Sequence, residues 1–219
     1  MKSYIYPVIH YLDMKTTLAN AAIAVNSGCA GVFLIHMNGQ DTLLTPALIE
    51  LRKLYPDLFI GINRLSCNAA ESVELNLACK ADATWVDNCG ILNGQMSPLT
   101  NDINRALANS DQHKVFGAVA FKYQREDFNP PASAKLALSL EFIPTTSGPG
   151  TGHAPDLSKI KSMADVVERE NLAIASGITP ENITEFLPYC AHFLVSTGIS
   201  KTFYEFDSEK VASLVRKSK

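Results

Sequence analysis

The chain has 219 residues, a length at which α/β and all-β barrels commonly form one domain. Its 47% hydrophobic and 19% charged residues exclude a disordered chain, and its net charge of −3, with Lys and Arg scattered, excludes the basic surface of a nucleic-acid-binding protein. No apolar run approaches the ~18 residues that span a bilayer. We therefore expect a cytoplasmic globular protein that binds neither nucleic acid nor membrane.

Eight short apolar runs recur along the chain. They are mostly continuous Val, Ile, Leu and Phe, which is the pattern of strands covered on both faces. The runs are 4–12, 30–37, 58–65, 83–89, 114–123, 140–146, 172–178 and 191–198.

Amphipathic segments with helical spacing separate and follow these runs. Thr45, Thr179 and Asp207 stand at helix starts as capping residues, and Gly28 ends the first helix. This eightfold alternation predicts a single-domain (β/α)8 TIM barrel over residues 1–219. The alternative is an open doubly wound sheet, which more often shows G-x-G-x-x-G after its first strand, where this chain has LDMKTT. The expected helices are 16–28, 45–55, 68–80, 98–110, 131–139, 156–170, 179–189 and 207–218.

Polar residues interrupt the apolar runs at their carboxyl ends, where TIM barrels carry their chemistry. Lys122 ends the run GAVAFK, where an ammonium is costly unless it faces a ligand, water or a carboxylate such as Asp87. It could hold an anionic substrate, act as a Schiff-base amine, or form a structural ion pair with Asp87. His10 and Asp87 are candidate general acids or bases. Further pocket candidates are Asp13, His36 and Asn63.

Metal and cofactor binding are not expected. The chain has no H-x-H on its first strand and no H-E-x-x-H, so the histidines do not form a metal motif. His113 and His192 precede strands and should lie at the opposite, stability face of the barrel. Trp85, within the fourth strand, is expected to serve packing.

The last two strands lead into ASGITPEN and STGISK. Loops after strands seven and eight of a TIM barrel often bind phosphate, because free N–H groups and a helix dipole favour an anion there. The sequence therefore predicts phosphate binding at Ser176, Gly177, Thr197 and Gly198. The alternative is that these are tight turns that merely need glycine.

The stretch IPTTSGPGTGHAP follows the sixth strand and combines glycines with hydroxyl residues. Its position beside the two phosphate loops predicts a substrate-contacting loop or lid. The alternative is a flexible connector restricted by Pro149 and Pro155. The residues expected to contact substrate are Thr146, Ser147, Gly148, Gly150, Thr151 and Gly152.

Five segments together resemble the BtpA/SgcQ family of barrels: GINRLSCN, VAFK, TTSGPGTGHAPDLSKIK, ASGITPENI and FLVSTGISK. The chain departs from that family after its first histidine, where YLDMKT replaces a Pro-rich turn, and after its second strand, where HMNGQD replaces a Glu-Asn pair. The resemblance implies a ribulose-phosphate-binding barrel, in a family linked both to photosystem assembly and to nucleosidase or sugar-phosphate chemistry. The glycine-rich loop and last two turns also resemble phosphoribosylanthranilate isomerase.

Two functions remain open from the sequence. The first is an isomerase, lyase or nucleosidase acting on a sugar phosphate or phosphoribosyl compound, in which Lys122 stabilises negative charge and His10 or Asp87 moves a proton. The second is a non-catalytic assembly or stability factor that retains an anion pocket. Convergent polar groups in a mouth pocket would favour the first, and a large apolar patch elsewhere the second. A homodimer is open, since barrels of this size often pair.

Overall fold

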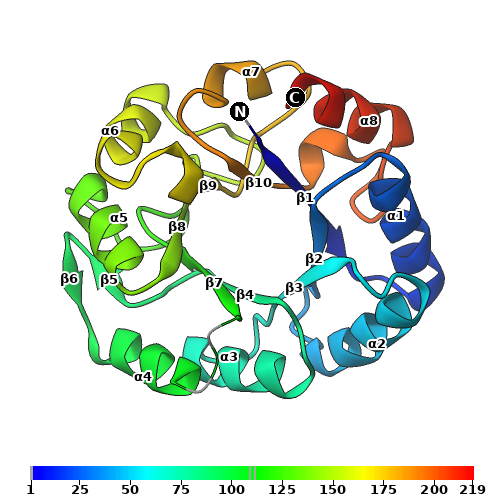
Figure 1. Ribbon diagram of the computed structural model, residues 1–219, viewed down its shortest axis with the longest axis horizontal. Coiled ribbons are helices and arrows are strands. Elements are labelled where there is room, and N and C mark those ends of the chain that lie inside the picture. The colour runs from blue at the N-terminus through cyan, green and yellow to red at the C-terminus, as the bar shows by residue number, and fades with distance from the viewer. Residues whose placement is uncertain (1, 109, 111) are drawn as a thin grey trace.

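A computed structural model describes residues 2–108, 110 and 112–219. Eight parallel strands close into a barrel in the order β1-β10-β9-β8-β7-β4-β3-β2 (Figure 1). Each lies within one of the eight apolar runs, which confirms the predicted TIM barrel. The strands are β1 (Tyr4–His10), β2 (Gly31–Ile35), β3 (Phe59–Asn63), β4 (Ala83–Val86), β7 (Lys114–Ala118), β8 (Phe142–Thr146), β9 (Ala173–Ile174) and β10 (His192–Val195).

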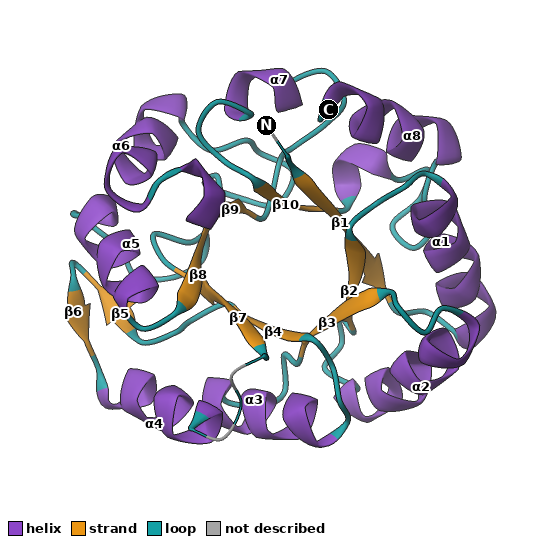
Figure 2. Ribbon diagram, in the orientation of Figure 1, coloured by secondary structure: helices purple, strands orange, loops and turns teal. Residues whose placement is uncertain are grey.

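A ring of helices covers the outside of the barrel (Figure 2). Side chains at several helix starts accept the free N–H groups of the first turn, as Asp207 does from Glu209 and Lys210. The helices are α1 (Met14–Asn26), α2 (Leu44–Leu54), α3 (Ala69–Ala78), α4 (Pro98–Leu107), α5 (Pro130–Ser139), α6 (Leu157–Val167), α7 (Ile183–Phe186) and α8 (Ser208–Lys217), with 3-10 turns η1 (Asp41–Leu43), η2 (Arg169–Asn171) and η3 (Thr197–Ile199).

Two elements differ from the sequence-based expectation. A small antiparallel hairpin, β5 (Ile91–Leu92) and β6 (Gln95–Met96), follows the fourth barrel strand and turns at Asn93-Gly94. That dipeptide is a strong hairpin signal, but it lies outside the eight apolar runs. The expected helix 179–189 shrinks to the four residues of α7. The amide of Asn182 instead folds the segment before it into a turn, by bonding to Thr179 N and Gly177 O.

The start of α2 also differs. A 3-10 turn, η1, leads directly into Leu44, so Thr45 lies inside the helix and does not cap it. The Thr45 hydroxyl accepts a hydrogen bond from the guanidinium of Arg64, which is buried and also donates to the Asp41 carbonyl. The polar side chain that resembled a cap therefore joins α2 to the loop after β3.

Large aromatic side chains fill the barrel interior. Phe33 meets Tyr6, Trp85 and Phe116 in edge-to-face contacts with ring centroids 5.0–6.2 Å apart. Edge-to-face pairs stabilise cores beyond the apolar area they bury. Because this layer is closed, a ligand can enter only above it.

His113 and His192 lie at the amino ends of strands, away from the carboxyl-end loops, as the sequence predicts. The His192 ring stacks on Tyr4 at 4.8 Å, and its Nε2 lies 3.0 Å from the Glu170 carbonyl. Burial lowers the pKa of His192 to about 4, so the ring is neutral at physiological pH. Both of its environments are structural ones.

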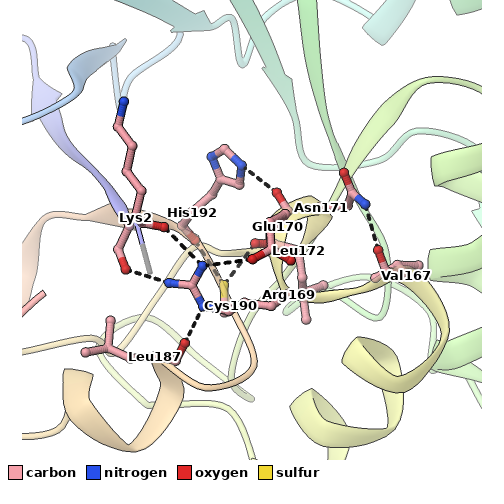
Figure 3. A network of polar contacts seen from close by, with 10 residues as sticks. Lys2, Val167, Arg169, Glu170, Asn171, Leu172, Leu187, Cys190 and His192 are labelled. Carbon is pink, nitrogen blue, oxygen red and sulfur yellow. Dashed lines mark hydrogen bonds and ion pairs between the residues drawn. The ribbon is translucent and has the colours of Figure 1, made fainter. Parts of the chain in front are cut away.

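Arg169 binds several chain segments together at this amino-end face (Figure 3). Its side chain is only 8% exposed. The guanidinium donates to the carbonyls of Leu187 and Lys2 and to the Ser3 hydroxyl, at 2.6–3.0 Å. Its one carboxylate partner, Glu170, lies 3.4 Å away and is largely exposed. Arg169 therefore acts chiefly as a multiple donor to backbone that would otherwise be unpaired.

Replacing Arg169 with methionine is expected to destabilise the protein by about 2–4 kcal/mol. The loss combines charge-assisted hydrogen bonds with carbonyls left unpaired, each worth roughly 1–3 kcal/mol. In a chain of this size that corresponds to a fall in melting temperature of roughly 4–16 °C, measurable by calorimetry. Arg105→Met on exposed α4, where Arg105 pairs only with Asp102, is the control and should change stability by less than about 1 kcal/mol. Equal losses in both variants would contradict this role.

Candidate functional site

A cavity of about 180 Å³ opens at the carboxyl ends of the barrel strands, above the aromatic layer. It brings together eight of the predicted site residues: His10, Asp87, Lys122, Thr151, Gly152, Ser176, Gly177 and Thr197. Its floor is formed by Val8, Ile35, Trp85, Ala175 and Leu194. The cavity therefore has a polar rim and an apolar base, the usual character of a small-molecule site.

Asp87 and Lys122 face this cavity from the neighbouring strands β4 and β7. Burial raises the pKa of Asp87, while a 3.1 Å hydrogen bond from Asn63 and the charge of Lys122 oppose that rise. Burial also lowers the pKa of Lys122, against the charge of Asp87. Within residues 2–108, 110 and 112–219, no ion pair joins Lys122 to Asp87 within 4.0 Å. The two groups influence each other across the cavity without the direct contact of a structural salt bridge.

His10 ends β1 at the cavity wall. Its Nδ1 lies 3.0 Å from the carbonyl oxygen of Phe203, and its ring is 4.4 Å from the Phe203 ring. A carbonyl can only accept, so Nδ1 carries the proton and Nε2 is left as the basic nitrogen. Burial lowers the pKa of His10, opposed by the Phe203 carbonyl and aided by Lys122. His10 is thus a neutral imidazole with one nitrogen free to take a proton.

Backbone N–H groups converge on the opposite side of the cavity. In the part of the chain that the structure describes, the N–H groups of Gly152, Ser176, Gly177, Ser196 and Thr197 donate to no protein acceptor. They belong to the loops after β8, β9 and β10, and Thr197 opens the 3-10 turn η3. Successive free N–H groups from loops and a helical turn form a nest that suits an anion.

Glycine lets these three loops touch backbone to backbone. A Cβ at Gly177 would overlap the backbone of His153 and Ala154, and one at Gly198 would overlap the Ile178 carbonyl. Gly148 lies under the same His153–Ala154 segment. The glycines of the stretch after β8 and of the last two turns therefore hold the loops together. Of them, only Gly152 and Gly177 also line the cavity.

A buried network fixes the loops after β7 and β8. The Ser147 hydroxyl accepts the N–H of Lys122 at 2.8 Å, and Thr146 donates to the Ala120 carbonyl at 3.1 Å. The Lys159 ammonium donates to the carbonyls of Ala120 and Ser147. Burial lowers the pKa of Lys159 to about 8, opposed by Asp156 and Asp127. Thr146 and Ser147 thus position Lys122 from behind the cavity wall.

The other predicted residues lie outside the cavity lining. Asp13 caps α1 by accepting the Thr16 N–H at 2.7 Å. His36 is buried, with Nδ1 close to the N–H groups of Asn38 and Gln40. Asn63 contributes through its hydrogen bond to Asp87. Gly150 lies beside His153 and the Tyr123 hydroxyl.

Several cavity residues were not predicted from the sequence. Met37, Leu65 and Phe203 stand on loops, where an apolar side chain gives no chemical signal. Trp85, expected to serve packing, packs against Phe33 and Phe121 and also lines the cavity floor. Lys159 lies in a helix, where a lysine normally indicates a solvated face, and only the fold shows that it binds loop carbonyls.

Neither a metal cluster nor a membrane span is found in the described residues. Within 2–108, 110 and 112–219, no three His, Cys, Asp or Glu side chains group together closely enough to hold a metal ion. Over the same ranges, every helix is too short or too polar to cross a bilayer.

No protein-family model matches the sequence, and no curated protein matches it either. The BtpA/SgcQ resemblance is therefore not established as membership. Solved structures do match. A protein described as native KDPGal is 16% identical, with a TM-score of 0.71 over 99% of this chain and 95% of its own. KGPDC from Streptococcus mutans is 14% identical, with a TM-score of 0.70 over 100% and 98%.

Phosphoribosyl anthranilate isomerase from Thermus thermophilus is also similar. It is 15% identical to this chain, with a TM-score of 0.68 over 98% of this chain and 97% of its own. At identities of this level the likeness establishes the fold alone. The chain therefore has the TIM-barrel architecture of these enzymes along almost its whole length.

Proposed function

We propose that this protein is an enzyme that acts on a phosphorylated sugar or phosphoribosyl compound bound at the carboxyl-end cavity. The observation that carries the proposal is the set of unpaired N–H groups at Gly152, Ser176, Gly177, Ser196 and Thr197, which line one side of the cavity. A phosphomonoester supplies several strong acceptors and negative charge, which both suit such a nest.

The groups that would perform the chemistry lie around the rest of the cavity. Lys122 can stabilise negative charge that develops on the substrate, because its ammonium is half-buried and has no carboxylate in direct contact. His10 offers a basic Nε2, and Asp87 has a raised pKa, so either could accept or return a proton. An isomerase, lyase or nucleosidase reaction would each use this combination.

The structural neighbours favour the same substrate class. Their names include an aldolase of 2-dehydro-3-deoxyphosphogluconate type and phosphoribosyl anthranilate isomerase, and the Streptococcus KGPDC was also solved in complex with ribose 5-phosphate. The position of the unpaired N–H groups, on the loops after the last three strands, is also the position at which many TIM barrels bind phosphate. The alternative of a purely structural barrel gives no reason for titratable groups to converge at the mouth.

The test is ligand-dependent thermal unfolding with inorganic phosphate and ribose 5-phosphate. A ligand at 100 times its dissociation constant should add about 2.7 kcal/mol to stability. Thr197→Asp would place a carboxylate among the N–H donors and is expected to abolish the stabilisation. Thr197→Asn, of equal size but neutral, should retain most of it. No stabilisation of the unmodified protein by either compound would refute the phosphate site and, with it, the proposed function.

A further inference from the structure

Four large apolar side chains stand exposed around the rim of the same cavity. They are Met37 (42% exposed), Leu65 (38%), Phe203 (48%) and Tyr123 (77%). Single exposed apolar residues are ordinary on protein surfaces, but here four loops each direct one toward one cavity. A sugar phosphate alone has no apolar group that would cover them.

The strand order places Met37 and Leu65 across the mouth from the unpaired N–H groups. Met37 follows β2 and Leu65 follows β3. In the closed ring of eight strands, β2 is four strands from β8 and β3 is four strands from β9, which is the diametrically opposite position (Figure 1). An anion on the loops after β8 and β9 therefore faces Met37 and Leu65 over the full width of the barrel.

The candidate reactive groups lie between these two ends. His10 ends β1, and Asp87 and Lys122 follow β4 and β7, so they flank the line that joins the N–H groups to the apolar pair. The enclosed space of about 180 Å³ equals roughly six water molecules at ~30 Å³ each. A ligand anchored by phosphate inside this space would extend its far end to the open, apolar part of the rim.

We propose that the substrate is a two-part molecule, a ribosyl 5-phosphate that carries a flat aromatic or heteroaromatic group at its other end. This inference rests on the proposed function and specifies its substrate class. The phosphate occupies the N–H groups, and the ring lies against Met37 and Leu65, with Phe203 and Tyr123 available to flank it. The bond between sugar and ring then lies near His10, Asp87 and Lys122.

Aromatic stacking gives this arrangement a measurable effect. Contact between a base and an aromatic side chain contributes enough to change affinity by tenfold or more. Short linear sugar phosphates would gain nothing from the rim. The site would therefore distinguish two classes of phosphorylated compound that the N–H groups alone bind equally well.

The experiment is calorimetric titration of the protein with ribose 5-phosphate and with adenosine 5′-monophosphate, which adds a flat heteroaromatic ring to the same sugar phosphate. Adenosine 5′-monophosphate is expected to bind at least tenfold tighter. In the double variant Met37→Ser, Leu65→Ser, the ratio of the two affinities should fall to about threefold or less. Leu54→Ser, which removes a 57%-exposed leucine at the end of α2, is the matched control and should leave the ratio unchanged.

The outcomes separate this inference from the proposed function. If ribose 5-phosphate binds and adenosine 5′-monophosphate binds no tighter, the two-part substrate is refuted while the phosphate site stands. If neither binds, the proposed function fails first. If the double variant leaves the ratio intact but changes the molecular mass measured by sedimentation, the apolar rim contacts a second copy of the chain, which also overturns the inference.

Discussion

Gly177→Ala is expected to destabilise the protein by at least about 3 kcal/mol and to weaken ribose 5-phosphate binding at least tenfold. Gly177 has φ +69°, a conformation that costs an L-residue about 1–2 kcal/mol. Its added methyl would also overlap the backbone of His153 and Ala154, which no side-chain rotation can relieve. The two loops would have to separate, and the N–H groups of Gly152 and Gly177 would then no longer face one ligand.

Two other glycines separate these costs. Gly28 has φ +79° with nothing within 4 Å of an added Cβ, so Gly28→Ala should cost only the conformational ~1 kcal/mol. Gly198 lacks a positive φ, but its added Cβ would overlap the Ile178 carbonyl, so Gly198→Ala carries the overlap alone. Denaturant unfolding of the three variants measures each contribution. If Gly177→Ala were no worse than Gly28→Ala, the loop contact would not matter.

The barrel could be predicted because its signal repeats. Each strand is a continuous apolar run, and eight alternations leave little choice of architecture. The rule that chemistry lies at the carboxyl ends of barrel strands then selected His10, Asp87 and Lys122, and the structure brings all three to one cavity. This part of the site follows from topology, since the end of a strand is fixed once the strand is identified.

Loop geometry could not be predicted in the same way. Asp13 and Gly198 follow strands as the cavity residues do, yet Asp13 turns back to cap α1 and Gly198 packs on Ile178. A strand-end position gives an address within about one loop, whereas lining a cavity depends on the φ and ψ of each loop residue. Met37 and Leu65 were missed for the converse reason, because an apolar loop residue carries no chemical signal until its neighbours are known.

Asp87→Asn is expected to lower kcat/KM by about 10²–10⁴-fold, the range for loss of a general acid or base. The substrate for this assay is the compound turned over in a screen of phosphorylated sugars and phosphoribosyl compounds. Ribose 5-phosphate should bind the variant at least as tightly as the unmodified protein, because a negative charge has left the cavity. Lys122→Met should do the opposite and weaken that binding, since the cation near the anion is lost.

The same variant makes a second, activity-independent prediction. Burial raises the pKa of Asp87 in the folded state above its ordinary 3.8, so at neutral pH its charged form is less favourable in the folded chain than in the unfolded one. Asp87→Asn should therefore raise the melting temperature at pH 7. The gain should shrink as pH falls through the folded-state pKa and vanish below 3.8, where both states are protonated.

Asp57→Asn, at an exposed turn position, is the control and should alter neither activity nor melting temperature. A catalytic carboxylate held at a cost in stability is expected to show both effects together, less activity and more stability, because the burial that raises its pKa also penalises its charge. A carboxylate that serves only to hold the barrel together would show the reverse, with stability falling when Asn63 loses its charged partner. Measuring both quantities on Asp87→Asn therefore decides whether this cavity is a site of proton transfer or a structural feature of the barrel mouth.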